Sequence, residues 1–383
     1  MTGTGPARVL FVDSSGYEDL GGASTVLDEL IRRVDRGRFV PALACLSPGR
    51  WPELVRSRGT PAYSFPRSRL RSPRNLATLV GGLARLIRAR DIDLVHASEN
   101  TALLYATLAA RLTGTPVLWH IHSPLQPRAR TERAVAAVLH RLPPAHIVFT
   151  SDGARRRSVA FGGVPSTVIP PGVDVAARAG GDGVRARAAF GIPATAPLVT
   201  MFARIEPMKG QIDLVRALGI VGKTHPDLHA VLCGPPDRAS RYWARLQELA
   251  AELALGPRLQ FPGDVRPPLK DDLVAASDVV AHPSLAESFG LAVLEAMAAG
   301  KAVVAGATDG PRLLIEDGRD GVLVPPGDVD ALAGALARLL DDPDRRAAMG
   351  AAAAVAARAH GVEPMVERFE AVWDGILAQR RRR

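Results

Sequence analysis

Short apolar runs alternate with longer helical stretches along this chain, and this alternation restricts the fold more than any other feature of the sequence. Runs such as "RVLFVD" (8–13) and "LVTMFAR" (198–204) are dominated by apolar residues, several of them β-branched. Such runs are typical of strands buried on both faces, whereas the stretches between them repeat their apolar residues with a helical period. Strands that alternate with helices predict an α/β fold built on doubly wound parallel sheets.

The alternation occurs in two series, separated by a Pro- and Gly-rich segment at 170–190 that is typical of a linker. The first series predicts strands at 8–13, 38–46, 93–98, 116–123 and 146–151 and helices at 23–34, 75–91, 100–114 and 130–142. The second predicts strands at 198–204, 229–234, 259–263, 279–284, 301–306 and 321–326 and helices at 211–221, 241–253, 328–341 and 363–379. The sequence therefore predicts two Rossmann-like domains, 1–178 and 190–361, facing across a cleft that holds the ligand.

Arginine accounts for 44 of the 48 basic residues, and charge is spread unevenly along the chain. Residues 1–190 hold 26 Lys and Arg against 14 Asp and Glu, a net +12, whereas residues 191–383 hold 22 against 25, a net −3. An anionic partner of the first half is one explanation, and a codon bias toward Arg is another. Cys45 and Cys233 lie in different halves, and we recognise no signal peptide or bilayer-spanning apolar run. We therefore expect a cytoplasmic protein.

A Gly-rich turn, "SSGYEDLGGAS", joins the first strand to its helix and contains Gly21 and Gly22. The unpaired amides of a helix N-terminus favour phosphate, and glycine lets the backbone approach it closely. The turn lacks the GxGxxG spacing, and the second strand ends in "CLSPG" without an acid to hold a ribose, which disfavours a dinucleotide-dependent dehydrogenase. A plain connection between strand and helix explains the turn equally well.

Two cations, Arg204 and Lys209, follow the first strand of the second series and precede its helix. At the carboxyl end of a strand they would be placed to clamp a diphosphate. Lys209 is one of only four lysines in the chain, which favours a specific role. A pair of solvated loop residues is the alternative.

Two acids, Glu287 and Glu295, lie seven residues apart in "HPSLAESFGLAVLEAMAAGKAVVA", an otherwise apolar and small stretch. We expect Ser288 to cap a helix that Gly300 ends, so that Glu287 precedes the helix and Glu295 lies two turns inside it. Because Glu295 is the only charge in that helix, we expect it to face a buried or ligand-lined surface. A salt bridge to Arg is the alternative, since a buried carboxylate needs a partner.

These segments together resemble a known family. "ARIEPMKG", "FPGDV", "ASDVVAHPSLAESFGLAVLEAMAAGKAVVA" and "IEDGRDGVLVPPGD" are similar to the C-terminal half of retaining, nucleotide-sugar-dependent glycosyltransferases of the GT-B fold, the E-x7-E family. "LGGASTVLDEL", "VLWHIHSP" and "VIPPGVD" extend the resemblance over nearly the whole chain. It implies transfer of a hexosyl group from a UDP- or GDP-sugar to an acceptor hydroxyl, with retention of configuration and without a metal or other cofactor. It also implies that the last helix, about 362–383, returns to the N-terminal domain.

The resemblance implies a role for each matching residue. Arg204 and Lys209 would neutralise the donor diphosphate. Glu295 would accept hydrogen bonds from the ribose, and Glu287 from the donor sugar. His122 would lie on the acceptor side, with His120 as the neighbouring alternative. Further donor contacts implied in the same way are Gly21, Gly22, Val265, Phe289, Gly290 and Leu291.

One departure from the family concerns the donor-sugar pocket. Where many relatives carry a Glu in a Gly-Gly-x-Pro-Glu run, this chain has Arg312 and Leu313 in "TDGPRLLIEDG". The donor pocket is therefore expected to differ. No DxD metal motif is recognised, and the cation pair makes a divalent metal unnecessary.

Several alternatives stay open at this point. The segment 56–74 holds six arginines and no acid, so it reads either as a surface that docks on an anionic membrane or as a solvated loop. Nucleic acid is disfavoured, because aromatic residues are not interleaved with the arginines. The rival functions are a nucleotide-sugar epimerase on a similar scaffold and an inactive nucleotide- or membrane-binding relative. Glycan, lipid-linked sugar and small metabolite all remain candidate acceptors.

Overall fold

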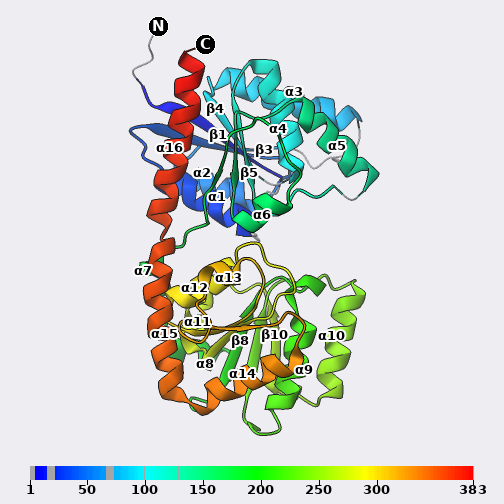
Figure 1. The fold of residues 1–383 in the computed structure, drawn as a ribbon, viewed down its shortest axis with the longest axis vertical. Helices are drawn as coiled ribbons and strands as arrows, with labels where there is room; N and C mark the ends of the chain where they lie inside the picture. Colours follow the sequence, from blue (N-terminus) through cyan, green and yellow to red (C-terminus); the bar gives the residue numbers. More distant parts are fainter. Residues whose placement is uncertain (1–4, 15–21, 66–72, 99, 128, 383) are drawn as a thin grey trace. The chain divides into compact units, whose positions relative to one another are not determined.

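The computed structural model describes residues 5–14, 22–65, 73–98, 100–127 and 129–382 (Figure 1). The chain divides into two compact units. Unit 1 consists of Met1–Pro171 together with Glu363–Arg383, and unit 2 consists of Gly172–Val362. Each unit is built on a parallel sheet with helices on both faces.

Unit 1 holds a seven-stranded sheet in the order β3-β2-β1-β4-β5-β6-β7, and every pairing is parallel. Its strands are β1 (Ala7–Asp13), β2 (Phe39–Cys45), β3 (Ala62–Ser64), β4 (Leu94–Ser98), β5 (Val117–Ile121), β6 (His146–Phe149) and β7 (Ser166–Val168). Its helices are α1 (Gly22–Arg33), α2 (Arg50–Ser57), α3 (Pro73–Ala89), α4 (Asn100–Thr113), α5 (Arg130–Arg141), α6 (Asp152–Arg157) and the last helix, α16 (Val362–Arg381). The strand order reverses between β1 and β4.

Unit 2 holds a six-stranded parallel sheet in the order β10-β9-β8-β11-β12-β13. Its strands are β8 (Leu198–Phe202), β9 (His229–Cys233), β10 (Leu259–Gly263), β11 (Val279–His282), β12 (Ala302–Gly306) and β13 (Val322–Val324). Its helices are α7 (Val175–Arg178), α8 (Gly183–Ala189), α9 (Gln211–Val221), α10 (Arg241–Glu252), α11 (Leu269–Ala276), α12 (Leu291–Ala298), α13 (Pro311–Leu314), α14 (Val329–Asp341) and α15 (Pro343–Ala357), with a 3-10 turn η1 at Pro207–Lys209. The order reverses between β8 and β11, and ligands bind such sheets at the carboxyl ends of the strands beside this reversal.

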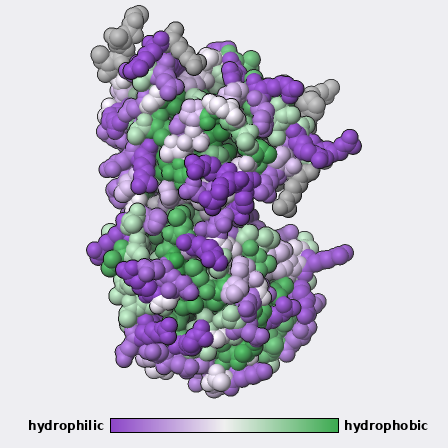
Figure 2. Space-filling model, in the orientation of Figure 1, coloured by the Kyte–Doolittle hydropathy of each residue, from purple (hydrophilic) through white to green (hydrophobic). Residues whose placement is uncertain are grey.

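Three inner strands of unit 2, β8, β11 and β12, are buried along their whole length, which explains why most of their residues are apolar. In β8, Val199 and Met201 belong to one hydrophobic cluster, whereas Leu198 and Phe202 belong to another. Alternate residues of a strand point to opposite faces, so the two clusters are the two layers between sheet and helices. Hydrophilic and hydrophobic residues are interspersed over the face of each unit in view (Figure 2).

The segment 170–190, expected to be a linker, instead contains α7 and α8, and both pack on unit 2. The backbone amide of Asp182 donates to Asp272 Oδ1 at 2.8 Å, and Arg178 pairs with Asp271 at 2.6 Å. Gly181 lies so close that a Cβ atom there would be 2.2 Å from the carbonyl oxygen of Asp271. The glycine therefore serves close packing, which composition alone does not distinguish from flexibility.

Seven further helices and strands were not predicted from the sequence: β3, β7, α2, α6, α11, α13 and α15. The two strands have three residues each and the two helices of unit 1 have eight and six, too few to show a clear period. Helix α15 is long, but its Ala-rich sequence "PDRRAAMGAAAAVAA" gives little contrast between faces. No helix within the described part of the chain is both long and apolar enough to cross a bilayer.

Helix α16 completes the core of unit 1. Phe369 and Trp373 are fully buried, and the Trp373 ring meets Phe39 edge-on at 5.2 Å and Phe11 at 5.7 Å between centroids. Glu370, 5% exposed, accepts a hydrogen bond from the guanidinium of Arg38 at 2.6 Å. The last helix therefore contributes both apolar burial and a partly buried ion pair to unit 1.

We predict that Trp373→Ala lowers the free energy of unfolding by about 3–5 kcal/mol, because it removes a fully buried aromatic side chain. The exposed Val355 on α15 provides the control, and Val355→Ala should change stability by no more than about 0.5 kcal/mol. Urea unfolding followed by far-UV circular dichroism measures both. A loss below about 1 kcal/mol in Trp373→Ala would show that α16 is not part of the core.

Candidate functional site

The candidate site of unit 2 lies where β8 and β11 end, beside the reversal of strand order. Two loops leave these neighbouring strands, and Gly210, with φ of 77°, lies where they touch. A Cβ atom at Gly210 would lie 2.2 Å from the carbonyl oxygen of Pro283, so only glycine fits there. This approach brings Lys209, on the first loop, to Glu287, on the second.

An ion pair between Lys209 and Glu287 is the centre of this site. Lys209 Nζ lies 2.7 Å from Glu287 Oε2, and both side chains are more than four-fifths buried. His282 Nε2 lies 3.2 Å from the same carboxylate oxygen and 3.0 Å from Ser284 Oγ, while the Ser288 amide donates to Glu287 Oε1 at 3.2 Å. Burial acts to raise the pKa of Glu287, but the bond from His282 and the charge of Lys209 outweigh it and hold that pKa well below its ordinary value.

Arg204 lies on the same loop as Lys209, but the structure does not bring its guanidinium to Glu287. Its side chain is 65% exposed and pairs with Glu206 at 3.2 Å, while its carbonyl accepts a hydrogen bond from Gln211 at 2.8 Å. A surface pair of this kind is weak and exchanges partners readily. The exposed Arg204 guanidinium can therefore contact an incoming anion directly. Lys209 can contact the same anion only if its ion pair with Glu287 weakens or breaks.

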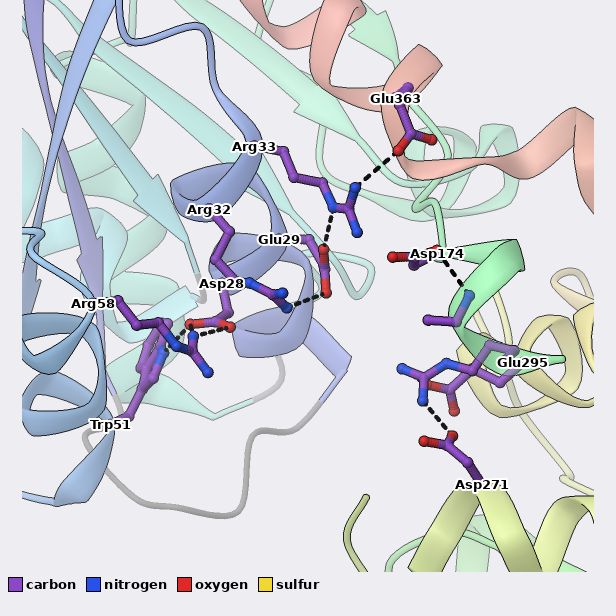
Figure 3. Close-up of polar contacts among 12 residues, drawn as sticks. Asp28, Glu29, Arg32, Arg33, Trp51, Arg58, Asp174, Asp271, Glu295 and Glu363 are labelled. Carbon is purple, nitrogen blue, oxygen red and sulfur yellow. Dashed lines mark hydrogen bonds and ion pairs between the residues drawn. The ribbon is translucent and has the colours of Figure 1, made fainter. Parts of the chain in front are cut away.

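Glu295 is buried in the second turn of α12, in agreement with the expectation of a buried surface, and it is held by two cations. Lys270 Nζ lies 2.6 Å from Oε2 and Arg178 lies 3.3 Å from Oε1. Arg178 also pairs with Asp271, which Figure 3 labels beside Glu295. Burial acts to raise the pKa of Glu295, but the charges of Lys270 and Arg178 outweigh it and the pKa is lowered. A carboxylate accepts about four hydrogen bonds, so hydroxyl donors can still bind.

The start of α12 differs from the expectation that Ser288 caps it. The helix begins at Leu291, and Gly290, with φ of 94°, is the capping residue. The extra residues form a turn, in which Gly310 donates to the Glu287 carbonyl at 3.0 Å and Phe289 is buried. The backbone of Phe289, Gly290 and Leu291 therefore directly follows Glu287 at the N-terminus of an eight-residue helix.

The remaining predicted donor residues are more scattered. Val265 packs partly buried against the second hydrophobic cluster, and its neighbour Asp264 pairs with Arg266 at 2.6 Å. At the position of the expected family Glu, Arg312 turns back to donate to the carbonyl of Ala307 at 2.7 Å, and Leu313 is 47% exposed. In unit 1, Gly22 is the first, exposed residue of α1, whereas Gly21 lies outside the described residues.

Three histidines lie together at the carboxyl ends of β4 and β5 in unit 1. His122 is half-buried and bonds Ser98 Oγ through Nε2 at 3.0 Å, and its ring lies 3.9 Å from that of His120. His120 is fully buried and bonds His96 Nε2 at 3.2 Å, so it faces the interior rather than the carboxyl edge. Burial lowers the pKa of His96 and of His122 to about 3 and keeps that of His120 low as well.

His282, Ser284 and Lys270 are among the residues of these clusters that were not identified from the sequence. His282 ends the strand that precedes Glu287 and Ser284 follows two residues later, so their place at a carboxyl end was a usable signal. Lys270 shares the rarity that drew attention to Lys209, since the chain has four lysines. Among the residues that the structure describes, no group of three or more His, Cys, Asp or Glu is arranged to hold a metal ion.

Comparison with known proteins identifies the family. The chain matches the description "Glycosyltransferase Family 4" over residues 20–177 and "Glycosyl transferases group 1" over residues 185–355. A D-inositol 3-phosphate glycosyltransferase of Kribbella flavida is 30% identical over 389 residues, which cover 92% of this chain and 90% of that protein. The chain belongs to the group 1, family four glycosyltransferases. A second relative of the same description, from Thermomonospora curvata, is 29% identical, and the aligned region covers 95% of this glycosyltransferase and 93% of that protein.

Solved structures show the same architecture. HepE of Anabaena, in complex with UDP and glucose, has a TM-score of 0.85 and 27% identity, covering 96% of this chain and 100% of that one. Sucrose-phosphate synthase of Thermosynechococcus elongatus has a TM-score of 0.79 at 22% identity, covering 97% and 100%, which supports the fold alone. The prediction of two doubly wound, Rossmann-like domains of the GT-B class is confirmed, and the chain is a glycosyltransferase.

We predict that the buried histidines make this glycosyltransferase less stable as the pH falls. An unfolded histidine takes up a proton below about pH 6.5, but folded His96 does so only near pH 3. The unfolded state therefore binds more protons between these values, and stability falls by up to about 1.4 kcal/mol per pH unit for each such histidine. Urea unfolding between pH 7.5 and pH 5 would measure the slope.

His96→Phe tests the assignment, because the ring lies among Phe11, Phe369 and Trp373 and an aromatic replacement fits there. The variant should show a shallower fall in stability with acid, by up to the contribution of one histidine. His229→Gln, at an exposed edge of unit 2, is the control and should keep the wild-type slope. An unchanged slope in His96→Phe would contradict the buried, neutral state of His96.

Proposed function

We propose that this glycosyltransferase transfers a hexosyl group from a UDP-sugar to a hydroxyl of a phosphate-bearing polyol, with retention of anomeric configuration. The observation that carries the proposal is the Lys209–Glu287 pair at the carboxyl ends of β8 and β11. It lies in a fold that resembles HepE, which was solved with UDP-glucose as well as with UDP and glucose. A nucleoside diphosphate sugar offers a diphosphate for Lys209 and sugar hydroxyls for Glu287.

In this proposal, binding of the donor changes the pairing of the charged side chains in the site. The diphosphate takes Arg204 and Lys209 as counter-charges, and Glu287, released from part of its contact with Lys209, accepts hydrogen bonds from the sugar. Glu295 accepts the ribose hydroxyls, and the backbone from Phe289 to Leu291 offers amides to the anion at a helix N-terminus. Positive charge at the diphosphate stabilises it as it leaves, and this stabilisation is usually the largest single contribution to catalysis.

The state of Glu287 argues against a covalent glycosyl intermediate. Its carboxylate already accepts hydrogen bonds from Lys209 and His282 at Oε2 and from the Ser288 amide at Oε1, so neither oxygen is free to attack. We infer displacement on one face of the sugar. The acceptor oxygen bonds to the anomeric carbon as the bond to the diphosphate breaks, and the acceptor proton passes to the departing phosphate oxygen. The two cations, Arg204 and Lys209, supply the charge that a divalent metal would otherwise provide.

The acceptor class rests on the relatives and on unit 1. Both relatives described above are D-inositol 3-phosphate glycosyltransferases, which suggests a hydroxyl on a phosphorylated polyol. In unit 1, α5 begins shortly after His122, and the side chains of Arg130 and Arg133 in its first turn are exposed. Exposed guanidinium groups of this kind suit a phosphate.

The other readings receive less support. Family membership disfavours the epimerase, and the intact Lys209–Glu287 pair disfavours an inactive relative. For the Arg-rich segment 56–74, Arg56 donates to the carbonyl of Ala62 and Arg58 pairs with Asp28, which also accepts from Trp51 (Figure 3). These two arginines therefore have partners inside unit 1, residues 66–72 lie outside the described part, and we do not propose a membrane partner.

A direct test incubates the purified chain with UDP-, GDP-, ADP- and TDP-sugars, each with and without D-inositol 3-phosphate. Mass spectrometry measures both the nucleotide released and the glycosylated product. We expect acceptor-dependent release of UDP, a product of retained configuration by NMR, and a rate unchanged by EDTA. Release of no nucleotide from any donor would contradict the function, and an inverted product would contradict the mechanism.

We predict that Lys209→Ala lowers kcat/KM for the donor by about 10²–10³-fold, the range found when one donor to a developing anion is removed. Lys223→Ala is the matched control, because this lysine lies exposed just after α9 and should leave turnover unchanged. Steady-state kinetics with saturating acceptor measures the effect. Turnover near that of the wild type in Lys209→Ala would mean that the diphosphate does not bind at this pair.

A further inference from the structure

His282, the last residue of β11, lies beside Glu287 in the candidate site of unit 2. Its side chain is 3% exposed, and Nε2 contacts Glu287 Oε2 at 3.2 Å and Ser284 Oγ at 3.0 Å. Lys209 Nζ reaches the same Glu287 oxygen at 2.7 Å. These four residues, Lys209, Glu287, His282 and Ser284, form a connected polar cluster that we call the β11 network.

The ionised state of Glu287 fixes which ring nitrogen of His282 carries a hydrogen. An ionised carboxylate only accepts hydrogen bonds, so Nε2 of His282 is the donor to Glu287. Ser284 Oγ then accepts from the same N–H group. In the neutral ring this leaves Nδ1 without a proton, so a second proton can bind at Nδ1 while the bond from Nε2 to Glu287 persists.

We propose that His282 is a positioning residue that holds Glu287 in place and takes up a proton from solvent when a diphosphate binds at Lys209. The inference rests on the proposed function, since it requires the diphosphate at this site. Without ligand, the charge of Glu287 is balanced by Lys209 at 2.7 Å. A diphosphate adds negative charge and draws on the same lysine, so Glu287 loses part of its counter-charge.

The excess of negative charge acts on the imidazole, because a nearby anion favours the protonated form of a histidine. Histidine is the side chain whose charge changes most readily near physiological pH, so a change in the surrounding charge can add a proton to the ring. Among the described residues, Glu287 contacts His282 directly, and Lys209 contacts Glu287. Arg204 and Glu206 lie on the same loop as Lys209 and pair with each other. The neighbouring strand positions are uncharged, since His282 pairs with Ala305 of β12.

Isothermal titration calorimetry with UDP at pH 7 tests the proposal in two buffers of different ionisation enthalpy. The difference in apparent enthalpy gives the number of protons taken up on binding. His282→Gln keeps an N–H donor near the Nε2 position but cannot be protonated, so the protons taken up by UDP itself are the same in both proteins. We expect the wild type to take up on the order of half a proton more than His282→Gln, with affinities within about threefold of each other.

His282→Val tests the positioning role, because it removes the hydrogen bond to Glu287 and suits a strand. We expect Kd for the UDP-sugar to rise about tenfold, the consequence of losing one hydrogen bond to a charged group. His229→Gln is the matched control on β9, which β8 separates from β11, and there the ring is bonded to the carbonyl of Asp227. It should keep both the affinity and the proton count.

The outcomes separate this inference from the function on which it rests. If neither the wild type nor any variant binds UDP, the proposed function fails. If UDP binds and the wild type and His282→Gln take up equal numbers of protons, the inference about His282 is overturned while the function stands. NMR titration of the His282 ring in the wild type gives a second reading that needs no variant. Its midpoint should move to higher pH with UDP, and an unchanged midpoint would also overturn the proposal.

Discussion

The close approach of two loops at Gly210 and Pro283 is the constraint on which the candidate site depends. A parallel sheet whose order reverses between β8 and β11 places two carboxyl ends side by side, but their side chains meet only if the loops nearly touch. The absence of a Cβ atom at Gly210 permits that contact, and Lys209, one residue earlier, thereby reaches Glu287. A larger residue would separate the loops and leave Glu287 without its nearest cation.

Burial of charge explains the other pairings around the site. A carboxylate removed from water is costly unless it is paired, and both acids of the E-x7-E motif are mostly buried. Lys209 compensates Glu287, and Lys270 with Arg178 compensates Glu295. The compensating cations come from loops and helices other than α12, so the paired acids also fix those elements against it. A ligand that uses these acids must replace part of this pairing.

Sequence reasoning predicted the parts of the site that follow from local order. The alternation of strands and helices predicted two doubly wound domains, and the resemblance to the family implied the GT-B class. The position of Glu287 after a strand follows from "VVAHPS". It could not predict the pairing of Lys270 with Glu295, because these residues lie on different helices and meet only in the folded unit. The closely packed segment around Gly181 has the Pro- and Gly-rich composition of a linker, so composition did not reveal its packing. His120 faces the interior, where it bonds His96 of a different strand.

Buried histidines of unit 1 are neutral whereas buried acids of unit 2 are ionised, so we expect the two units to respond differently to pH. In unit 1 the histidines are kept neutral by burial, so acid opposes the folded state there. In unit 2 the acids are kept ionised by cations. Under the inference about His282, a bound diphosphate favours the protonated imidazole, so mild acid favours donor binding. Linkage requires affinity to rise as pH falls if binding takes up a proton. A decline in activity toward acid would then originate in the stability of unit 1 and not in loss of the donor, and measuring donor affinity and unfolding over the same pH range separates the two.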